Sequence, residues 1–477
     1  MLMNLSLLTL EIVVATLALF IFILGLVAPA NQKRGIGYFT VLSLVVSLII
    51  AIILHGESGT AFGTMYVVDP FSSYFKIAFL IAAVLVTMFS ISYVNKLGYN
   101  QGEFFALTVL ALLGMMIMSS AADFITFYLG LEMMTIPFII LTAFRYGDKA
   151  SSEAGMKYML LSAMSSAVLL YGLSILYGAA GSTLYSDVIN VITGDNIDAL
   201  TVIGLVFLLA GFGFKISMVP FHMWSPDIYQ GAPTPVTAFL AIGSKAAALA
   251  AMIRMFMIAL PETREVWMTL VIVLCAMTIV LGNFVAIPQT NIKRMLAYSS
   301  IAHAGYLLMG LVAFTNLGIS AILYYVMIYV FANAGAFACV NEFGNMTGSD
   351  EIKDYTGMWK RSPLIASVML LCLLSLGGIP PLAGFVGKFY LFTAIIDQGY
   401  IWLAFLGIGM SMVSVYYYLI VVKVMFLGKP VEETSVPVSL GAKTVMFVSA
   451  VASLFLGLYP APLTDIATKV AQLFFPM

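Results

Sequence analysis

Residues 210–221 of the chain read Ala-Gly-Phe-Gly-Phe-Lys-Ile-Ser-Met-Val-Pro-Phe, and residues 377–389 read Gly-Gly-Ile-Pro-Pro-Leu-Ala-Gly-Phe-Val-Gly-Lys-Phe. Each stretch interrupts a long apolar run and places Gly and Pro within one or two helical turns of a lysine. Backbone opened at membrane depth is tolerated only where protein buries it or where it lines a wet cavity. Paired interruptions in two halves of a chain indicate a transport site at a repeat interface, although Gly and Pro are also common in ordinary membrane helices.

The composition around these stretches is that of a membrane protein. Of the 477 residues, 62% are apolar and only 9% are Asp, Glu, Lys or Arg, against about 25% charged residues in globular proteins. Apolar windows bounded by Gly, Pro, Asn or charge predict about fourteen spanning helices, which leave no room for an extramembrane domain. We expect these spans to be centred near Leu17, Leu44, Ile81, Leu112, Leu131, Leu169, Leu208, Leu240, Val273, Leu307, Ile328, Ser375, Gly409 and Val451.

The basic residues indicate how the chain is oriented. Loops one, three, five, nine, eleven and thirteen hold most of the 21 Lys and Arg residues, with Lys157 assigned to loop five. Only Arg254, Arg264 and Lys469 are assigned to loops on the opposite side. Because short cytoplasmic loops carry an excess of Lys and Arg, we expect an even number of helices with both termini on the non-cytoplasmic side.

Four charged residues are predicted deep inside spans. Glu132 and Lys245 lie near the centres of their helices, while Lys215 and Lys388 adjoin the two interruptions. An ionisable group in mid-span costs at least about 2.5 kcal/mol on insertion scales, so each needs a partner, water or a function. Burial disfavours the ammonium form of lysine and a nearby carboxylate restores it, so a Glu132–Lys215 pair whose separation changes would load and unload a proton.

Other intramembrane polar groups are weaker candidates. Ser217, His222, Tyr298 and His303 could relay protons between the charged residues, but the histidines could equally be hydrogen-bonded packing residues. Lys76 and Glu11 lie within a turn or two of a helix end. An interfacial anchor or a contact with another subunit is favoured for that pair.

Several functional classes are excluded by the sequence. The chain contains no P-loop, no dinucleotide-binding fingerprint and no nucleophile elbow, which excludes an ATP-driven pump acting alone. The three cysteines are widely separated, and the 30 methionines are scattered without a Cys or His cluster, so packing explains both better than a metal site does. A formal net charge of −1 gives no reason to expect a nucleic acid partner.

Three long motifs follow one another between residues 220 and 391. Residues 220–235 read Pro-Phe-His-Met-Trp-Ser-Pro-Asp-Ile-Tyr-Gln-Gly-Ala-Pro-Thr-Pro, residues 291–306 read Asn-Ile-Lys-Arg-Met-Leu-Ala-Tyr-Ser-Ser-Ile-Ala-His-Ala-Gly-Tyr, and residues 378–391 surround the second interruption. They resemble the antiporter-like membrane subunits of proton-pumping NADH-quinone oxidoreductases (complex I), a family related to Mrp antiporters. Lys388, where the subunit M type carries glutamate, favours the subunit N type. Gln230 departs from the motif, since an acid is frequent there, and this puts a charge role of that loop in doubt.

The resemblance implies a fold and a proton route. The fold is an all-α polytopic membrane protein of about fourteen transmembrane helices, with two inverted five-helix repeats that each contain a broken helix. Within one membrane domain over 1–477, the expected segments are 1–102 (helices 1–3), 103–255 (first repeat, helices 4–8), 266–427 (second repeat, helices 9–13) and 438–477 (helix 14 and tail). The proton route implied by the family maps onto Glu132, Lys215, Lys245 and Lys388.

The resemblance also implies a division of labour in a larger assembly. This chain is expected to bind no cofactor or metal and to have no redox centre, with quinone, flavin and iron-sulfur clusters in other subunits. Its expected partners are other membrane subunits, through them a peripheral redox arm, and the lipid bilayer, in a bacterial cell inner membrane. We therefore expect a proton-translocating subunit of a multisubunit enzyme. Two alternatives remain: a subunit of a multisubunit sodium/proton antiporter, and a non-pumping scaffold subunit of a membrane oxidoreductase.

Overall fold

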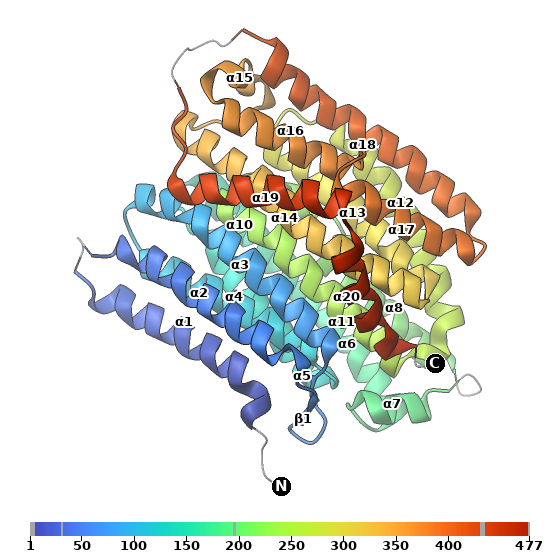
Figure 1. Ribbon diagram of the computed structural model, residues 1–477. Helices are drawn as coiled ribbons and strands as arrows, with labels where there is room; N and C mark the ends of the chain where they lie inside the picture. The colour runs from blue at the N-terminus through green and yellow to red at the C-terminus, as the bar shows by residue number, and fades with distance from the viewer. Residues whose placement is uncertain (1–4, 30–31, 194–196, 430–434, 476–477) are drawn as a thin grey trace.

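The chain forms a bundle of long apolar helices (Figure 1). The computed structural model describes residues 5–29, 32–193, 197–429 and 435–475. Over these residues, 13 helices are long and apolar enough to cross a membrane, and Pro363–Gly377 is a shorter apolar helix. All the predicted span centres lie in helices, which confirms the all-α polytopic fold. The outermost residues of the predicted terminal segments, 1–4 and 476–477, lie outside the described residues.

The helices follow the chain in this order: α1 (Thr9–Val27), α2 (Gly35–Ile53), α3 (Pro70–Leu97), α4 (Gln101–Ser120), α5 (Phe124–Thr142), α6 (Lys149–Ala180), α7 (Tyr185–Val191), α8 (Ala199–Ile216), α9 (Trp224–Gly231), α10 (Thr234–Phe239), α11 (Lys245–Arg254), α12 (Arg264–Ala286), α13 (Ile292–Ala313), α14 (Asn316–Thr347), α15 (Met358–Arg361), α16 (Pro363–Gly377), α17 (Ala383–Asp397), α18 (Ile401–Leu427), α19 (Leu440–Leu458) and α20 (Ala461–Ala471). The π-helical segments Leu240–Ser244 and Met255–Ala259 join α10 to α11 and follow α11.

Polar residues start many of these helices. Asp69, Asp123 and Asp198 each precede a helix and accept a hydrogen bond from a backbone N–H of its first turn. Such caps satisfy donors that a helix leaves free at its N-terminus. Several basic residues assigned to loops from the sequence lie within helices instead. Among them, Lys157 lies in the third turn of α6, and Arg254 is the buried last residue of α11.

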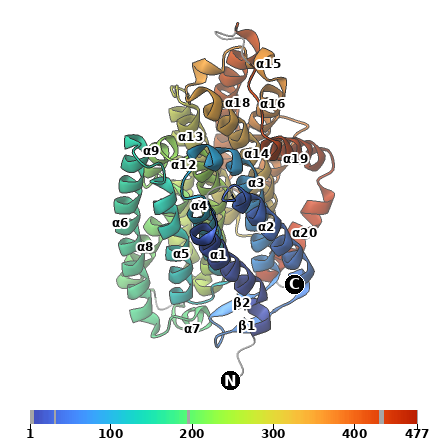
Figure 2. The same ribbon diagram turned by 90° about the vertical axis from the view of Figure 1, so that its left-hand side faces the viewer.

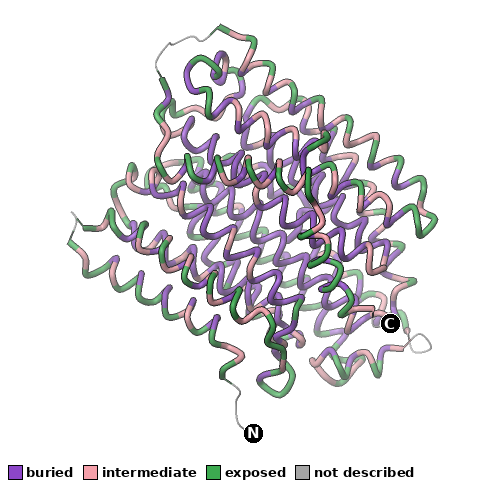
Figure 3. The backbone as a smooth tube through the Cα atoms, viewed as in Figure 1, coloured by how far each residue is buried: buried purple, intermediate pink, exposed green. Residues whose placement is uncertain are grey.

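The central helices are buried on all sides. The span over Thr234–Ala259 is buried throughout its most apolar stretch, and α13 and α14 are nearly so. By contrast, α1, α2, α18 and α19 are largely exposed, and α1 and α18 lie at opposite edges of the bundle (Figures 1 and 3). Polar residues on α11, α13 and α14 are therefore enclosed by protein rather than by lipid.

Both predicted interruptions are present. The first separates α8 from α9, and Ser217 ends α8 with a left-handed backbone angle φ of 63°. The second separates α16 from α17, and Gly378 ends α16 with φ of 84°, a conformation that favours glycine. Each break falls in the fourth helix of a predicted five-helix repeat; the repeat boundaries themselves stay predictions.

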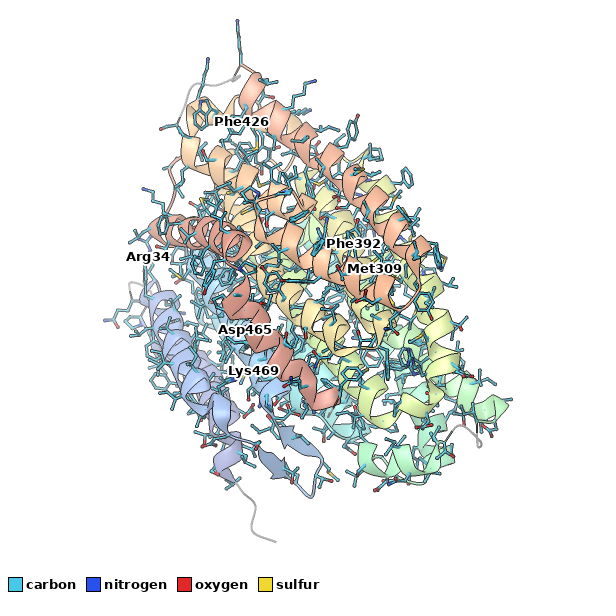
Figure 4. The ribbon with its side chains drawn as sticks, turned by 45° about the vertical axis from the view of Figure 1, so that its right-hand side comes forward. Arg34, Met309, Phe392, Phe426, Asp465 and Lys469 are labelled. Atoms are coloured by element: carbon cyan, nitrogen blue, oxygen red, sulfur yellow. The ribbon has the colours of Figure 1, made fainter. Side chains whose placement is uncertain are left out.

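One end of the bundle carries small additional elements. Strands β1 (Gly59–Ala61) and β2 (Tyr66–Val68) pair antiparallel, and Tyr66 forms an isolated bridge with Ala121. The hairpin and α7 lie at the same end as both chain termini (Figure 2). The last helix, α20, turns Asp465 and Lys469 outward on its exposed face (Figure 4).

Candidate functional site

Lys245 lies at the centre of the bundle as the first residue of α11. It is 6% exposed, and its Nζ donates a hydrogen bond to the Ser300 hydroxyl of α13 at 2.5 Å. The ring centroid of Tyr229 lies 5.6 Å from the same nitrogen, which favours a cation there. No carboxylate of the described residues forms an ion pair with it. A buried ammonium group that has only neutral partners can release its proton without breaking a salt bridge.

A small cavity adjoins Lys245. Its volume is about 20 Å³, and Lys245, Ser300, His303 and Tyr329 supply its polar lining among apolar neighbours. This volume holds about one water molecule, and the lining provides the two or more polar partners that a buried water needs. The predicted relay His303 is therefore placed beside the central lysine.

His303 continues this polar region toward the second half of the chain. Its Nδ1 lies 2.7 Å from the Tyr325 hydroxyl of α14, and its Nε2 lies 3.2 Å from the Tyr418 hydroxyl of α18. Tyr418 in turn makes a short hydrogen bond with Ser299. Because a hydroxyl both donates and accepts, the imidazole stands between two groups that can pass a proton on.

Lys388 lies at the second interruption, on α17. Its Nζ donates to the Gly377 carbonyl at 3.0 Å and to the Ser411 hydroxyl of α18 at 2.9 Å. The Gly377 oxygen belongs to the C-terminal end of α16, where the helix dipole favours a cation. The Tyr306 ring centroid lies 4.7 Å from Nζ, and a cavity of about 310 Å³ borders the side chain. Met309 of α13 and Phe392 of α17 lie side by side near this site (Figure 4), and Gly407 of α18 packs against both.

Glu132 and Lys215 are close but not directly paired. The Lys215 Nζ donates to Thr135 Oγ1 of α5 at 3.0 Å, whereas the Glu132 carboxylate accepts from the Ser166 hydroxyl of α6 at 2.6 Å. Thr135 follows Glu132 by one helical turn, so Lys215 reaches the helix that carries Glu132 but bonds to a neutral group. The hypothesis of direct contact is therefore not met in this conformation.

The remaining predicted relays surround the first interruption or line α13. Ser217 and His222 are buried, and neither Ser217 Oγ nor His222 Nδ1 has a hydrogen-bond partner among the described side chains and backbone. Tyr298 of α13 is buried as well. The described hydrogen bonds do not join these three residues to the cavity beside Lys245, so their roles stay predictions.

Comparison with known proteins places this geometry in a family. Residues 121–414 match the family described as NADH:quinone oxidoreductase/Mrp antiporter, transmembrane. The chain belongs to this family. It is 55% identical to NADH-quinone oxidoreductase subunit N of Moorella thermoacetica, with 99% of each chain aligned, and 52% identical, over 99% of each chain, to the same subunit of Desulforamulus reducens.

Solved structures agree with this assignment to the NADH:quinone oxidoreductase/Mrp antiporter family. A chain of respiratory complex I from Thermus thermophilus is 33% identical, with a TM-score of 0.82 over 96% of this chain and 100% of that chain. A chain of the Mrp complex from Dietzia sp. has a TM-score of 0.89 at 20% identity, over 99% and 98% of the two chains, and this likeness concerns the fold alone. The chain is thus a multi-pass membrane protein of this antiporter-like family.

Sequence reasoning missed charged contacts that this family member makes at the two ends of the bundle. At one end, Asp227 of α9 accepts from Lys157 at 2.9 Å and from Arg294 of α13 at 2.7 Å. Gln230 accepts from Arg294 at 3.2 Å, so the amide is a hydrogen-bond acceptor where an acid is frequent. At the other end Arg254 binds Asp69. The sequence did carry a signal for this contact. The eight residues between Lys245 and Arg254 are all apolar, which indicates that the buried helix continues as far as Arg254.

A polar cavity opens where α3 ends and α10 begins. It measures about 220 Å³ and is lined by Tyr93, Lys96, Arg145, Lys293 and Asp350, among others. Lys293 forms an ion pair with Asp350 at 3.0 Å and donates to the Ala232 carbonyl just before α10. Charged groups thus reach the start of the span that carries Lys245. Neither at this cavity nor anywhere else among the described residues is a group of three or more His, Cys, Asp or Glu residues arranged to hold a metal ion.

Proposed function

We propose that this chain is a proton-translocating membrane subunit of a NADH-quinone oxidoreductase, the subunit N of that assembly. The observation that carries the proposal is Lys245, a buried ammonium group bonded only to neutral groups and facing a water-sized cavity shared with His303. Relatives that are 55% and 52% identical over nearly the whole chain are named as this subunit. An intramembrane lysine is costly and is retained where it has a function.

The proposed route has a loading side and a relay side. Glu132 modulates the charge on Lys215, whose ammonium group bonds Thr135. Lys215 in turn influences Lys245 through the helices that lie between the two lysines. Lys245 is the central relay, and the water site and His303 lead from it toward α18. Lys388 is the terminal donor toward the exit or a neighbouring subunit. The 220 Å³ polar cavity supplies protons to this route from the side where Lys and Arg gather.

The same proposal covers place and partners. The excess of Lys and Arg on one side puts that side in the cytoplasm of a bacterium and both termini outside it. The other membrane subunits and the redox arm that they carry hold the quinone, flavin and iron-sulfur chemistry. This chain then receives its energy through conformational and electrostatic coupling to those subunits.

The test replaces Lys245 in the assembled complex. The Lys245→Ala variant is expected to lower the ratio of protons pumped to electrons transferred, measured with purified complex in liposomes. An unchanged ratio would refute the proposal. Purification of the wild-type chain with flavin and iron-sulfur subunits separates a respiratory complex from a sodium/proton antiporter.

A further inference from the structure

Arg254 makes three hydrogen bonds in a buried position at the far end of α11 from Lys245. The side chain is 1% exposed, and its two terminal nitrogens donate to the two carboxylate oxygens of Asp69, each at 2.8 Å. Its Nε donates to the backbone carbonyl of Ser119 at 3.0 Å, and the Phe71 ring centroid lies 5.2 Å from the guanidinium. Two parallel hydrogen bonds of this kind fix orientation as well as distance.

The guanidinium joins three helix ends. Asp69 caps α3 by accepting from the Ser72 N–H at 2.7 Å, Ser119 lies in the last turn of α4, and Arg254 ends α11. Burial acts to raise the pKa of the Asp69 carboxyl, but the Arg254 guanidinium and the hydrogen bonds from Ser72 together hold that pKa below its usual value. The pair is therefore ionised under physiological conditions.

The contact of Arg254 with Asp69 holds one end of α11, the helix that begins at Lys245, and this fixed point matters because α11 is isolated from its neighbours in the chain. Its ten residues begin at Lys245 and end at Arg254, and a π-helical segment lies at each end. A π-helical turn interrupts the regular i to i−4 hydrogen bonding, and such turns are frequent at functional sites. The α11 segment is thus a short regular helix, with about 13.5 Å between its end residues. Neither end continues directly into another α-helix that would fix its position.

The fixed point comes from the N-terminal part of the chain. Residues 121–414 match the antiporter family, whereas Asp69 and Ser119 precede that region. A second buried ion pair, Glu11–Lys76 at 2.8 Å, links α1 to α3 at the same end of the bundle. Lys76 also donates to the Tyr66 hydroxyl, and none of these three residues makes a described hydrogen bond or ion pair with α11. Among the ion pairs of the described residues, only Arg254–Asp69 joins the start of α3 to α11.

We infer that Asp69 and Arg254 are positioning residues for Lys245, and that through them the N-terminal helices take part in proton transfer. This inference rests on the proposed function. Because α11 is one short regular helix from Lys245 to Arg254, a shift of its Arg254 end would shift Lys245 relative to Ser300, His303 and the water-sized cavity. A displacement of about 1 Å at a reacting group can lower the rate about 100-fold.

The experiment uses the assembled complex in liposomes and compares Asp69→Asn, Arg254→Lys and Asp69→Glu with Lys245→Ala. Asp69→Asn removes the negative charge that pairs with Arg254. Arg254→Lys keeps the positive charge but loses the bidentate hydrogen bond, and Asp69→Glu keeps the carboxylate on a longer side chain. We expect Asp69→Asn and Arg254→Lys to lower the proton-to-electron ratio to the Lys245→Ala value, and Asp69→Glu to lower it partly. The double variant Lys245→Ala/Arg254→Lys is expected to show no further loss, since both changes disable one step.

Glu11→Gln is the matched control, because it breaks a buried ion pair at the same end without touching α11. It is expected to reduce the yield of assembled complex while leaving the proton-to-electron ratio of that complex unchanged. A wild-type ratio in assembled Arg254→Lys and Asp69→Glu complexes overturns the inference, even if Asp69→Asn fails to assemble. An unchanged ratio in Lys245→Ala refutes the proposed function instead, so the two failures are distinguishable.

Discussion

Gly384 is the position where one added carbon should separate the two halves of the second broken helix. A Cβ there would lie 1.7 Å from the Ser375 carbonyl oxygen of α16, where ordinary contact begins at 3.4 Å, so α16 and α17 must move apart by about 1.7 Å. Lys388 lies one turn further along α17 and bonds across this contact to the Gly377 carbonyl at 3.0 Å. The displacement would take that bond beyond hydrogen-bonding distance.

Gly384→Ala is therefore expected to destabilise the subunit by about 1–3 kcal/mol through overpacking. It should also lower coupled turnover by up to about 100-fold, since Lys388 is misplaced by more than 1 Å. Thermal denaturation of the purified complex and proton pumping in liposomes measure the two effects. Gly409→Ala in α18 is the matched control, because no atom lies within 4 Å of its added carbon. Wild-type turnover and melting temperature in Gly384→Ala would refute the reasoning.

Three further outcomes are expected. Lys388→Met should lower the proton-to-electron ratio because it removes the ammonium group that bonds the Gly377 carbonyl and the Ser411 hydroxyl, whereas Lys423→Met, at an exposed residue of α18, should leave the ratio unchanged. Thr135→Val should slow coupled quinone reduction, because it removes the hydroxyl that Lys215 bonds and leaves a buried donor unsatisfied, which costs about 1–3 kcal/mol. Thr135→Ser, which keeps a hydroxyl, should restore the rate of quinone reduction. Equal rates for both variants would contradict the role of that hydroxyl. Since the pKa of Asp69 is held below its usual value, its charge stabilises the fold above about pH 4 and that stabilisation is lost only as the pH falls through the lowered value. The difference in melting temperature between wild type and Asp69→Asn should therefore be constant from neutral pH down to about pH 5.

Local signals in the sequence were sufficient for the spans and their two interruptions. Gly378 and the prolines that follow it cannot continue a helix, and this conflict is visible without tertiary information. The neighbours of the buried charges were not predictable in the same way. Whether Lys215 meets Glu132 or Thr135 depends on how α8 is rotated against α5, and both residues lie on the α5 face within one turn. The sequence pattern is the same for either contact.

Arg254 illustrates a different limit. Its charge ended the apolar window, and this placed it in a loop, although the helix continues because Asp69 neutralises the charge from a distant part of the sequence. The π-helical turns on either side of α11 likewise have no local signature, since tight packing at Gly243 against Met115 is a property of the folded bundle.

The placement of His303 between two tyrosine hydroxyls has a consequence for timing. In the proposed route, a proton that enters one ring nitrogen of His303 leaves from the other, so each passage exchanges the protonated and unprotonated nitrogens of the imidazole. Tyr325 and Tyr418 are then oriented for the reverse trip, and the ring or both hydroxyls must turn back before another proton follows. This segment of the route would therefore pass one proton at a time, with a reorientation step before each further transfer, rather than a continuous proton current.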